Sequence, residues 1–165
     1  VLKDKKELLK SNPNRIIITP HLGEMSRLTG YPINYIRDNK VDAAKEFANG
    51  NVAMMINFSN YASEILGYKY KVVVLLKGYE TVITNGKYTY INPTGNSSMA
   101  NGGMGDTLLG MITSFVGQGM TNLMGTVCAA YIHGYIGQRL SKDLYTVNAS
   151  DVINLIPQTM KELIN

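Results

Sequence analysis

Runs of apolar residues indicate where this chain should form strands. RIIIT (15–19) is a β-branched run that stops at Pro20, as a short buried strand before a loop would. KVVVLL (71–76) is apolar at successive positions, which predicts a strand covered on both faces and favours a central parallel strand. TVIT and KYTYI flank Asn85 and Gly86, and this pair predicts a hairpin with a type I′ turn, because both central residues of that turn need positive φ.

Patterns with a helical period occupy most of the remaining chain. GEMSRLTG predicts a short helix closed by Gly30, and the segment 121–140 is apolar enough to be largely buried. Strands with helices on both sides indicate an α/β sandwich. Two buried strands and one hairpin are too few for a complete sheet, so residues 1–165 are expected to form the later part of one larger α/β domain, with a further segment of the same protein before Val1. The predicted helices are 23–30, 41–48, 52–66, 106–116, 121–140 and 149–164.

Composition describes a globular protein and excludes several partners. The 165 residues are 45% hydrophobic and 17% charged, which fits one domain with a real core. The net charge of +4 is modest and the lysines are interspersed with acids, so no nucleic-acid partner is expected. No apolar run reaches the roughly 18 residues of a membrane span, and a cytoplasmic location is predicted. Cys128 is the only cysteine, in an apolar run, which predicts a buried inert thiol in a reducing compartment.

The segment NPTGNSSMANGGMGDTL (92–108) carries the strongest chemical signal. It is neither a P-loop nor a Rossmann turn, since no G-x-x-x-x-G-K-[ST] is present and Leu108 stands where G-x-G-x-x-G needs glycine. A glycine run that leads into a helix leaves the backbone N–H groups of 102–106 at the positive end of the helix dipole, which predicts an anion site. The alternative is a flexible surface loop followed by an aspartate N-cap. The residues alone leave both interpretations open.

Three segments in order resemble the ADP/ATP-dependent NAD(P)H-hydrate dehydratase family, a branch of the ribokinase-like small-molecule kinases. They are TPHLGEM (19–25), VVVLLKGYETVI (72–83) and NPTGNSSMANGGMGDTLLG (92–110), with a weaker match in AAYIHG (129–134). The resemblance implies a three-layer α/β/α sandwich, incomplete at its N-terminus. It also implies a metabolite-repair reaction, in which a nucleotide phosphorylates the ring hydroxyl of hydrated NADH or NADPH and phosphate then leaves.

The resemblance assigns roles to particular residues. Asp106 would bind the substrate and accept the proton of its hydroxyl. Gly102, Gly103 and Gly105 would form the anion hole. Glycine is needed at these positions because any larger residue would have a side chain that holds the phosphoryl group away from the backbone amides. The residues expected to bind the adenine nucleotide are Gly105 together with Lys77, Gly78, Tyr79, Glu80 and Thr81.

Supporting residues and partners follow from the same resemblance. His21 would contact the hydrated dinucleotide, and Glu24 would hold this loop or organise magnesium. Asn92 and Asn96 would position the phosphate loop, whereas His133 is expected to be a satisfied core histidine outside the site. ADP or ATP with Mg²⁺ is the expected phosphoryl donor, and a homo-oligomer is expected.

Two other classes of function stay open from the sequence. A kinase of a vitamin-precursor alcohol would share the anion hole and Asp106, although TPHLGEM and NPTGN argue against it. The second alternative class is a nucleotide-binding module without catalytic activity.

Overall fold

The computed structural model describes residues 8–9, 12, 15–50 and 71–164. The chain divides into two compact units, residues 1–91 and 92–165, and each is described by itself. That both belong to one domain stays a prediction. The predicted helix 52–66 lies outside the described residues. None of the described helices combines the length and the apolar character needed to cross a membrane.

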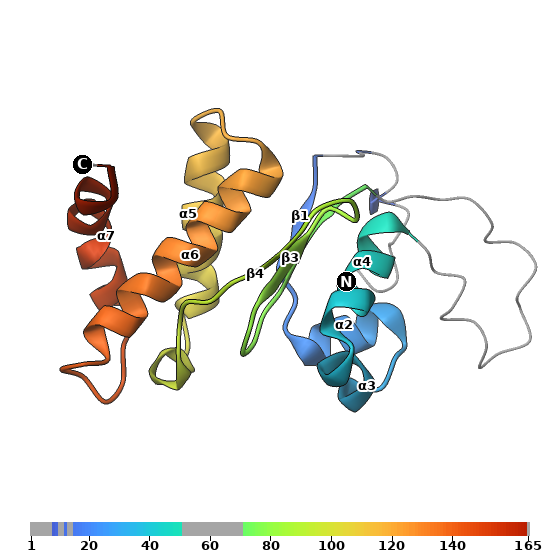
Figure 1. The fold of residues 1–165 in the computed structure, drawn as a ribbon, viewed down its shortest axis with the longest axis horizontal. Coiled ribbons are helices and arrows are strands. Elements are labelled where there is room, and N and C mark those ends of the chain that lie inside the picture. Colours follow the sequence, from blue (N-terminus) through green and yellow to red (C-terminus); the bar gives the residue numbers. More distant parts are fainter. Residues whose placement is uncertain (1–7, 10–11, 13–14, 51–70, 165) are drawn as a thin grey trace, which may run out of the picture. The chain divides into compact units, whose positions relative to one another are not determined.

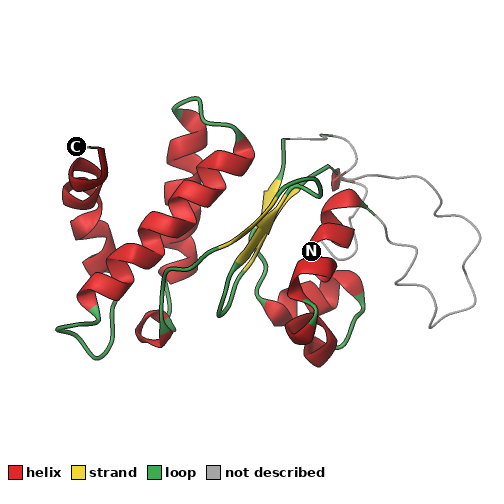
Figure 2. Ribbon diagram, viewed as in Figure 1, coloured by secondary structure: helices red, strands yellow, loops and turns green. Residues whose placement is uncertain are grey.

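The first unit contains a four-stranded sheet with the order β1-β2-β3-β4, drawn in yellow in Figure 2. Strand β1 (Ile17–Ile18) runs parallel to β2 (Val73–Leu76), whereas β3 (Val82–Thr84) and β4 (Thr89–Ile91) complete it as an antiparallel hairpin. All four residues of β2 are buried, as successive apolar positions require. The predictions of a strand within 15–19 and of a buried central strand within 71–76 are therefore confirmed, and the predicted parallel pairing holds on the β1 side only, since β2 is antiparallel to β3.

The hairpin is confirmed, but its turn differs from the prediction. Strand pairing ends at Thr84 and Thr89, and the Asn85 N–H donates to the Tyr88 carbonyl at 3.3 Å, so the central residues are Gly86 and Lys87. Only Gly86 of this central pair has positive φ, at 87°, which is the pattern of a type II′ turn. The Asn85 side chain accepts hydrogen bonds from the Lys87 and Tyr88 N–H groups, and these bonds keep Asn85 outside the turn centre.

Three helices of this unit lie on one face of the sheet (Figure 1): α2 (Leu22–Thr29), α3 (Ile33–Asp38) and α4 (Lys40–Asn49). Helix α2 ends at Gly30, whose φ of 84° is left-handed, as the sequence predicts for its C-cap. Their apolar faces and the sheet form one core that includes Met25, Ile36 and Phe47. Helix α3 was not predicted, because its six residues bury only one side chain, that of Ile36.

The second unit contains the helices α5 (Met104–Gly117), α6 (Asn122–Leu140) and α7 (Ala149–Ile164), which pack against one another (Figure 1). A short 3₁₀ turn, η3 (Ser97–Met99), precedes them. Helix α6 is buried at positions along most of its length, as predicted. Cys128 on α6 is only half-buried, so the prediction of a buried thiol is wrong.

Candidate functional site

The first group of candidate residues lies where β1 and β2 end. These strands are parallel, so their carboxyl ends meet at the same edge of the sheet, which is where open α/β sheets bind ligands. The segment after β1 carries Pro20 and His21, and the segment after β2 begins with Lys77. The Lys77 N–H donates to the Pro20 carbonyl at 2.8 Å, which ties the two segments together.

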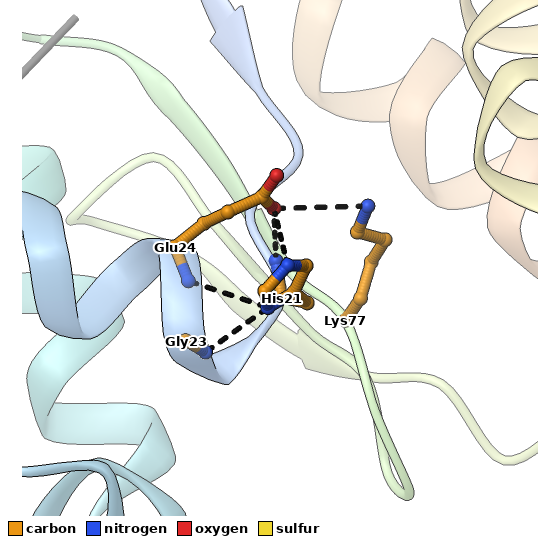
Figure 3. Close-up of polar contacts among 4 residues, drawn as sticks. All are labelled: His21, Gly23, Glu24 and Lys77. Carbon is orange, nitrogen blue, oxygen red and sulfur yellow. Dashed lines mark hydrogen bonds and ion pairs between the residues drawn. The ribbon is translucent and has the colours of Figure 1, made fainter.

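His21 caps helix α2 (Figure 3). Its Nδ1 accepts hydrogen bonds from the N–H groups of Gly23 at 3.0 Å and Glu24 at 3.3 Å, while Glu24 Oε2 accepts one from the His21 N–H at 2.8 Å. This reciprocal pair is a capping box in which histidine takes the place of serine or threonine. Because Nδ1 is an acceptor, the neutral ring carries its proton on Nε2, and the side chain is 54% exposed.

Glu24 organises this edge of the sheet. The same Oε2 atom lies 3.6 Å from His21 Nε2 and 4.0 Å from Lys77 Nζ (Figure 3). Ion pairs this exposed contribute little stability, so the carboxylate chiefly orients its neighbours. Glu24 thus contacts both segments at this edge, and its two predicted roles, holding this loop or organising magnesium, stay predictions. Within the described ranges, no three His, Cys, Asp or Glu side chains come together as a metal site.

The predicted nucleotide segment forms a tight turn between β2 and β3. Gly78, Tyr79 and Glu80 are exposed, and Tyr79 as a whole residue is 89% exposed. Gly78 has a φ of 138° and Glu80 a φ of 52°, and the Thr81 hydroxyl donates to the Gly78 carbonyl at 2.9 Å. A non-glycine residue with positive φ is uncommon and needs support from its surroundings. This turn is therefore held in a defined shape.

In the second unit, the glycine run leads directly into α5. Gly103 is the N-cap with a φ of 84°, no side chain caps the helix, and the first intrahelical bond runs from the Thr107 N–H to the Gly103 carbonyl at 3.0 Å. The hydrogen-bonded turn at Gly102 and Gly103 occupies one N–H group at the start of α5, and the other N–H groups of the first helical turn have no acceptor among the described residues. Free N–H groups at a helix N-terminus are suited to an anion.

Asp106 is the third residue of α5, so the interpretation of Asp106 as the N-cap is wrong, because the helix begins two residues earlier. Its side chain is exposed, and it has no hydrogen bond or ion pair within the described part of the chain. The positive φ of this loop falls on Gly103, whereas Gly105 has ordinary helical backbone and is half-buried. Gly102 is exposed, with open space where a side chain would begin.

The start of the glycine-rich segment is fastened to α6. Asn92 Nδ2 donates to the Ala130 carbonyl at 3.2 Å, and the Thr94 hydroxyl donates to the Tyr131 carbonyl at 2.9 Å. These carbonyls belong to a helix, so the segment must approach the helix backbone closely. Gly134 permits this, because a Cβ there would lie 2.7 Å from the Thr94 carbonyl carbon. The weaker AAYIHG motif thus supplies the surface that holds NPTGN.

Two asparagines hold the rest of this segment. Asn96 accepts a hydrogen bond from the Ser98 N–H at 3.1 Å, and its Nδ2 donates to the Ser141 hydroxyl at 2.7 Å. Asn101 Nδ2 donates to the Val147 carbonyl at 2.5 Å. The predicted roles of Asn92 and Asn96 in positioning the phosphate loop stay predictions, and Asn101 was missed. Nothing in the residue pattern marked Asn101, since its partner is a backbone carbonyl.

His133 on α6 is buried, as predicted, with 8% of its surface exposed. Burial lowers its pKa from 6.5, and a hydrogen bond with the Met104 backbone opposes this shift. Its Nε2 has no partner among the described residues, so the expectation of a satisfied histidine is wrong for this atom.

The sequence of this chain is similar to those of known proteins. A model of the NAD(P)H-hydrate dehydratase family matches residues 1–158. The chain belongs to this family. It is 41% identical over 150 residues to the ADP-dependent (S)-NAD(P)H-hydrate dehydratase of Staphylococcus aureus, a match that covers 90% of this chain and 46% of that protein.

The fold of this chain is also similar to the folds of solved structures. The ADP/ATP-dependent NAD(P)H-hydrate dehydratase of Bacillus subtilis, co-crystallised with ATP/Mg²⁺, superposes with a TM-score of 0.73 at 28% identity, over 91% of this chain and 51% of that one. A ribokinase-like superfamily protein of Enterococcus faecalis gives a TM-score of 0.68 at 28% identity, over 91% and 45%. The predicted α/β, ribokinase-like fold is therefore confirmed. The chain spans about half the length of these three proteins.

Proposed function

We propose that this protein catalyses the nucleotide-dependent dehydration of hydrated NADH and NADPH, acting on the S epimer. Membership of the NAD(P)H-hydrate dehydratase family carries the proposal. The free N–H groups at the start of α5 and the exposed Asp106 carboxylate beside them support it, because they form the part of the site that the chemistry needs most. The S. aureus relative is an ADP-dependent (S)-NAD(P)H-hydrate dehydratase, and the B. subtilis protein was crystallised with ATP/Mg²⁺.

The reaction has two steps. The ring hydroxyl oxygen forms a bond to the terminal phosphorus of ADP or ATP, the bond from that phosphorus to the leaving nucleotide breaks, and the hydroxyl proton passes to a base. The carbon–oxygen bond then breaks with its electron pair on phosphate, a ring proton is lost, and the ring double bond re-forms. Phosphate leaves far more easily than hydroxide, so phosphorylation makes the elimination possible.

Phosphoryl transfer requires mainly positioning and charge stabilisation. We assign the stabilising amides to the anion hole of Gly102, Gly103 and Gly105, where the glycines leave room for the phosphoryl group. Asp106 accepts the hydroxyl proton, since its carboxylate lies in the first turn of the same helix and is not engaged by another side chain in the described structure. A group that must take a proton from a substrate has to be free in this way.

The other assignments concern the first unit. Lys77, Gly78, Tyr79, Glu80 and Thr81 bind the adenine nucleotide, and the exposed turn that they form supports this role. His21 contacts the dinucleotide through Nε2, because Nδ1 is occupied in capping α2. Magnesium in nucleotide sites is held largely by phosphates and water, so we assign it no ligand of its own from this chain. The protein is expected to act in the cytoplasm as a homo-oligomer.

A kinase of a vitamin-precursor alcohol would use the same amides and Asp106 but would release a phosphorylated product. A nucleotide-binding module would bind nucleotide without turnover. Incubation with hydrated NADH, ADP or ATP and Mg²⁺ separates the three. Return of NADH absorbance with release of phosphate supports the dehydratase, a stable phosphorylated alcohol supports the kinase, and binding alone supports the module.

Replacement of Asp106 by asparagine tests the assigned base. Asp106→Asn removes the negative charge and the ability to take a proton, and no cap is lost because Asp106 caps nothing. The rate of NADH recovery should fall by about 100-fold to 10,000-fold, the usual contribution of general base catalysis. Nucleotide affinity, measured by calorimetry, should hold or rise as a charge that repels phosphate disappears.

Asp42→Asn is the matched control, since Asp42 is an exposed aspartate in the first turn of α4. It makes the same chemical change at the same kind of helix position and should leave the rate within about twofold. A rate for Asp106→Asn as high as that of the control would remove Asp106 from the mechanism.

A further inference from the structure

The turn at residues 78–81 is supported by a side chain from a distant segment. Lys40 is the first residue of α4, and its Nζ donates hydrogen bonds to the carbonyls of Tyr79 at 2.5 Å and Glu80 at 2.7 Å. Its ammonium group also lies beside Gly78, where a Cβ would be 3.7 Å from Nζ. One side chain therefore binds two successive carbonyls of the turn and lies beside a third residue.

Lys40 is half-buried, which is unusual for a lysine. Burial lowers the pKa of its amino group, and the negative charge of Glu80 opposes this shift. A buried ammonium group is stable only where acceptors replace the water that it loses. The two carbonyls supply these acceptors, so the lysine and the turn depend on each other.

The bonds to Lys40 also fix the direction of two amides. A trans peptide is planar, so its C=O and N–H point in opposite directions, and the described part of the chain contains no cis peptide. The Tyr79 carbonyl shares a peptide with the Glu80 N–H, and the Glu80 carbonyl shares one with the Thr81 N–H. Since both carbonyls point toward Lys40, both N–H groups point away from it. The Thr81 N–H closes the hydrogen-bonded turn at residues 79 and 80 on the Gly78 carbonyl, whereas the Glu80 N–H has no acceptor among the described residues.

The Glu80 N–H, which points away from Lys40, is a backbone donor suited to an anionic or carbonyl-like group. The positive φ of Glu80 is part of this arrangement, and a residue other than glycine keeps that conformation only when its surroundings fix it. Lys40 is the surrounding group that contacts both flanking peptides.

We propose that Lys40 is a positioning residue for nucleotide binding, which holds the 78–81 turn so that the N–H group of Glu80 faces the nucleotide. The proposal rests on the proposed function, in which this turn binds the adenine nucleotide. Lys40 itself touches no ligand. It acts through the backbone of the turn, so its loss should weaken nucleotide binding and leave the chemical step intact.

Lys40→Met, Lys40→Arg and Lys45→Met test this in the full chain. Methionine keeps the length of the stem but removes the charge and the donors, whereas arginine keeps donors that can span two carbonyls. Lys45 lies on the same helix without a polar contact in the described structure, so Lys45→Met controls for loss of a lysine from α4. Dissociation constants for ADP and ATP come from calorimetry, and KM and kcat from NADH recovery.

Lys40→Met should raise the nucleotide dissociation constant and KM about tenfold and change kcat less than threefold, and Lys40→Arg should restore most of the affinity. Lys45→Met should match the wild type. A nucleotide affinity for Lys40→Met within twofold of the control overturns the proposal, and so does a loss confined to kcat. If the wild type binds nucleotide but recovers no NADH, the proposed function fails while the effect of Lys40 on binding still decides this inference.

A second measurement keeps the proposal testable if Lys40→Met does not fold. Backbone amide NMR signals of the wild-type protein are followed as ADP is added. The signal of Glu80 should shift with the same midpoint as the calorimetric titration. If ADP binds and this signal does not move, or if the wild type binds neither ADP nor ATP, the proposal is overturned.

Discussion

Replacing Gly134 by alanine should separate the phosphate-loop segment from the helix that holds it. A Cβ at this position of α6 would lie 2.7 Å from the Thr94 carbonyl carbon and 2.8 Å from the Gly95 nitrogen. Both atoms belong to the backbone, so no side-chain rotation relieves the overlap. To reach ordinary contact at 3.4 Å, the backbone must move by about 0.7 Å, the difference between 3.4 and 2.7 Å.

The magnitude follows from three opposing effects. Alanine is favoured over glycine inside a helix by about 1 kcal/mol. Overpacking of this kind costs about 1–3 kcal/mol. The displacement also weakens the hydrogen bonds from Asn92 to Ala130 and from Thr94 to Tyr131, each of which contributes about 1 kcal/mol. We expect a net loss of about 2 kcal/mol, or a melting temperature about 4–8 °C lower for a chain of this size.

Two other glycines provide controls for urea unfolding and for nucleotide-dependent NADH recovery. A Cβ at Gly137, on the same helix, meets Cγ and Cε of Met99 at 2.6 Å, and a methionine side chain can repack. A Cβ at Gly110, on α5, meets nothing within 4 Å, so Gly110→Ala should gain about 1 kcal/mol. The free energy of unfolding should therefore be highest for Gly110→Ala, lower for Gly137→Ala and lowest for Gly134→Ala. Only Gly134→Ala should lose most of the rate of NADH recovery. Equal stability and rate for the Gly134 and Gly110 variants would refute this account of the segment.

Two further predictions concern the start of α5 and its neighbour His133. Gly103→Ala places a side chain at a φ of 84° and a Cβ 3.1 Å from that of Ala149, so it should lower the free energy of unfolding by about 1–2 kcal/mol. Gly102→Ala, which has open space for its side chain, should change the free energy of unfolding by less than about 0.5 kcal/mol. Equal values for the two variants would contradict the requirement for a left-handed N-cap. Because burial lowers the pKa of His133, its neutral form is favoured by folding, so this contribution is complete above about pH 6.5 and is lost as the pH falls toward the folded-state pKa. Urea unfolding of His133→Phe should show a flatter decline below pH 6.5 than the wild type or His21→Asn, and parallel declines in all three would exclude His133 as the titrating group.

Elements with strong periodicity could be predicted from the sequence, and those fixed by a single contact could not. The strand β2 and the helix α6 are long apolar patterns whose burial follows from composition. Helix α3 was not predicted from the sequence because only Ile36 of its six residues is buried, which leaves no apolar periodicity. The turn type was wrong because the Asn85 side chain binds two N–H groups of its own turn, a local choice that the dipeptide rule does not weigh.

The chemistry of the candidate site was more predictable than its supports. A glycine run followed by aspartate at a helix start is a local pattern, and the structure places both at the N-terminus of α5. The supports join residues far apart: Lys40 binds carbonyls 39 and 40 positions away, and Asn92 one that is 38 positions away. Each acceptor is a backbone carbonyl, which every residue possesses, so the partner leaves no mark in the sequence.

This difference determines how variants of the two kinds of residue should be interpreted. Asp106 is exposed and has no partner in the described structure, so changing it removes chemistry without removing a contact of the fold. Asn92 and Lys40 donate to buried or strained backbone, so changing them alters the shape of a segment before it alters any contact with a ligand. A variant that loses rate while keeping stability and nucleotide affinity therefore identifies a reacting group. A variant that loses affinity together with the local backbone geometry identifies a support, even where no part of its side chain reaches the nucleotide.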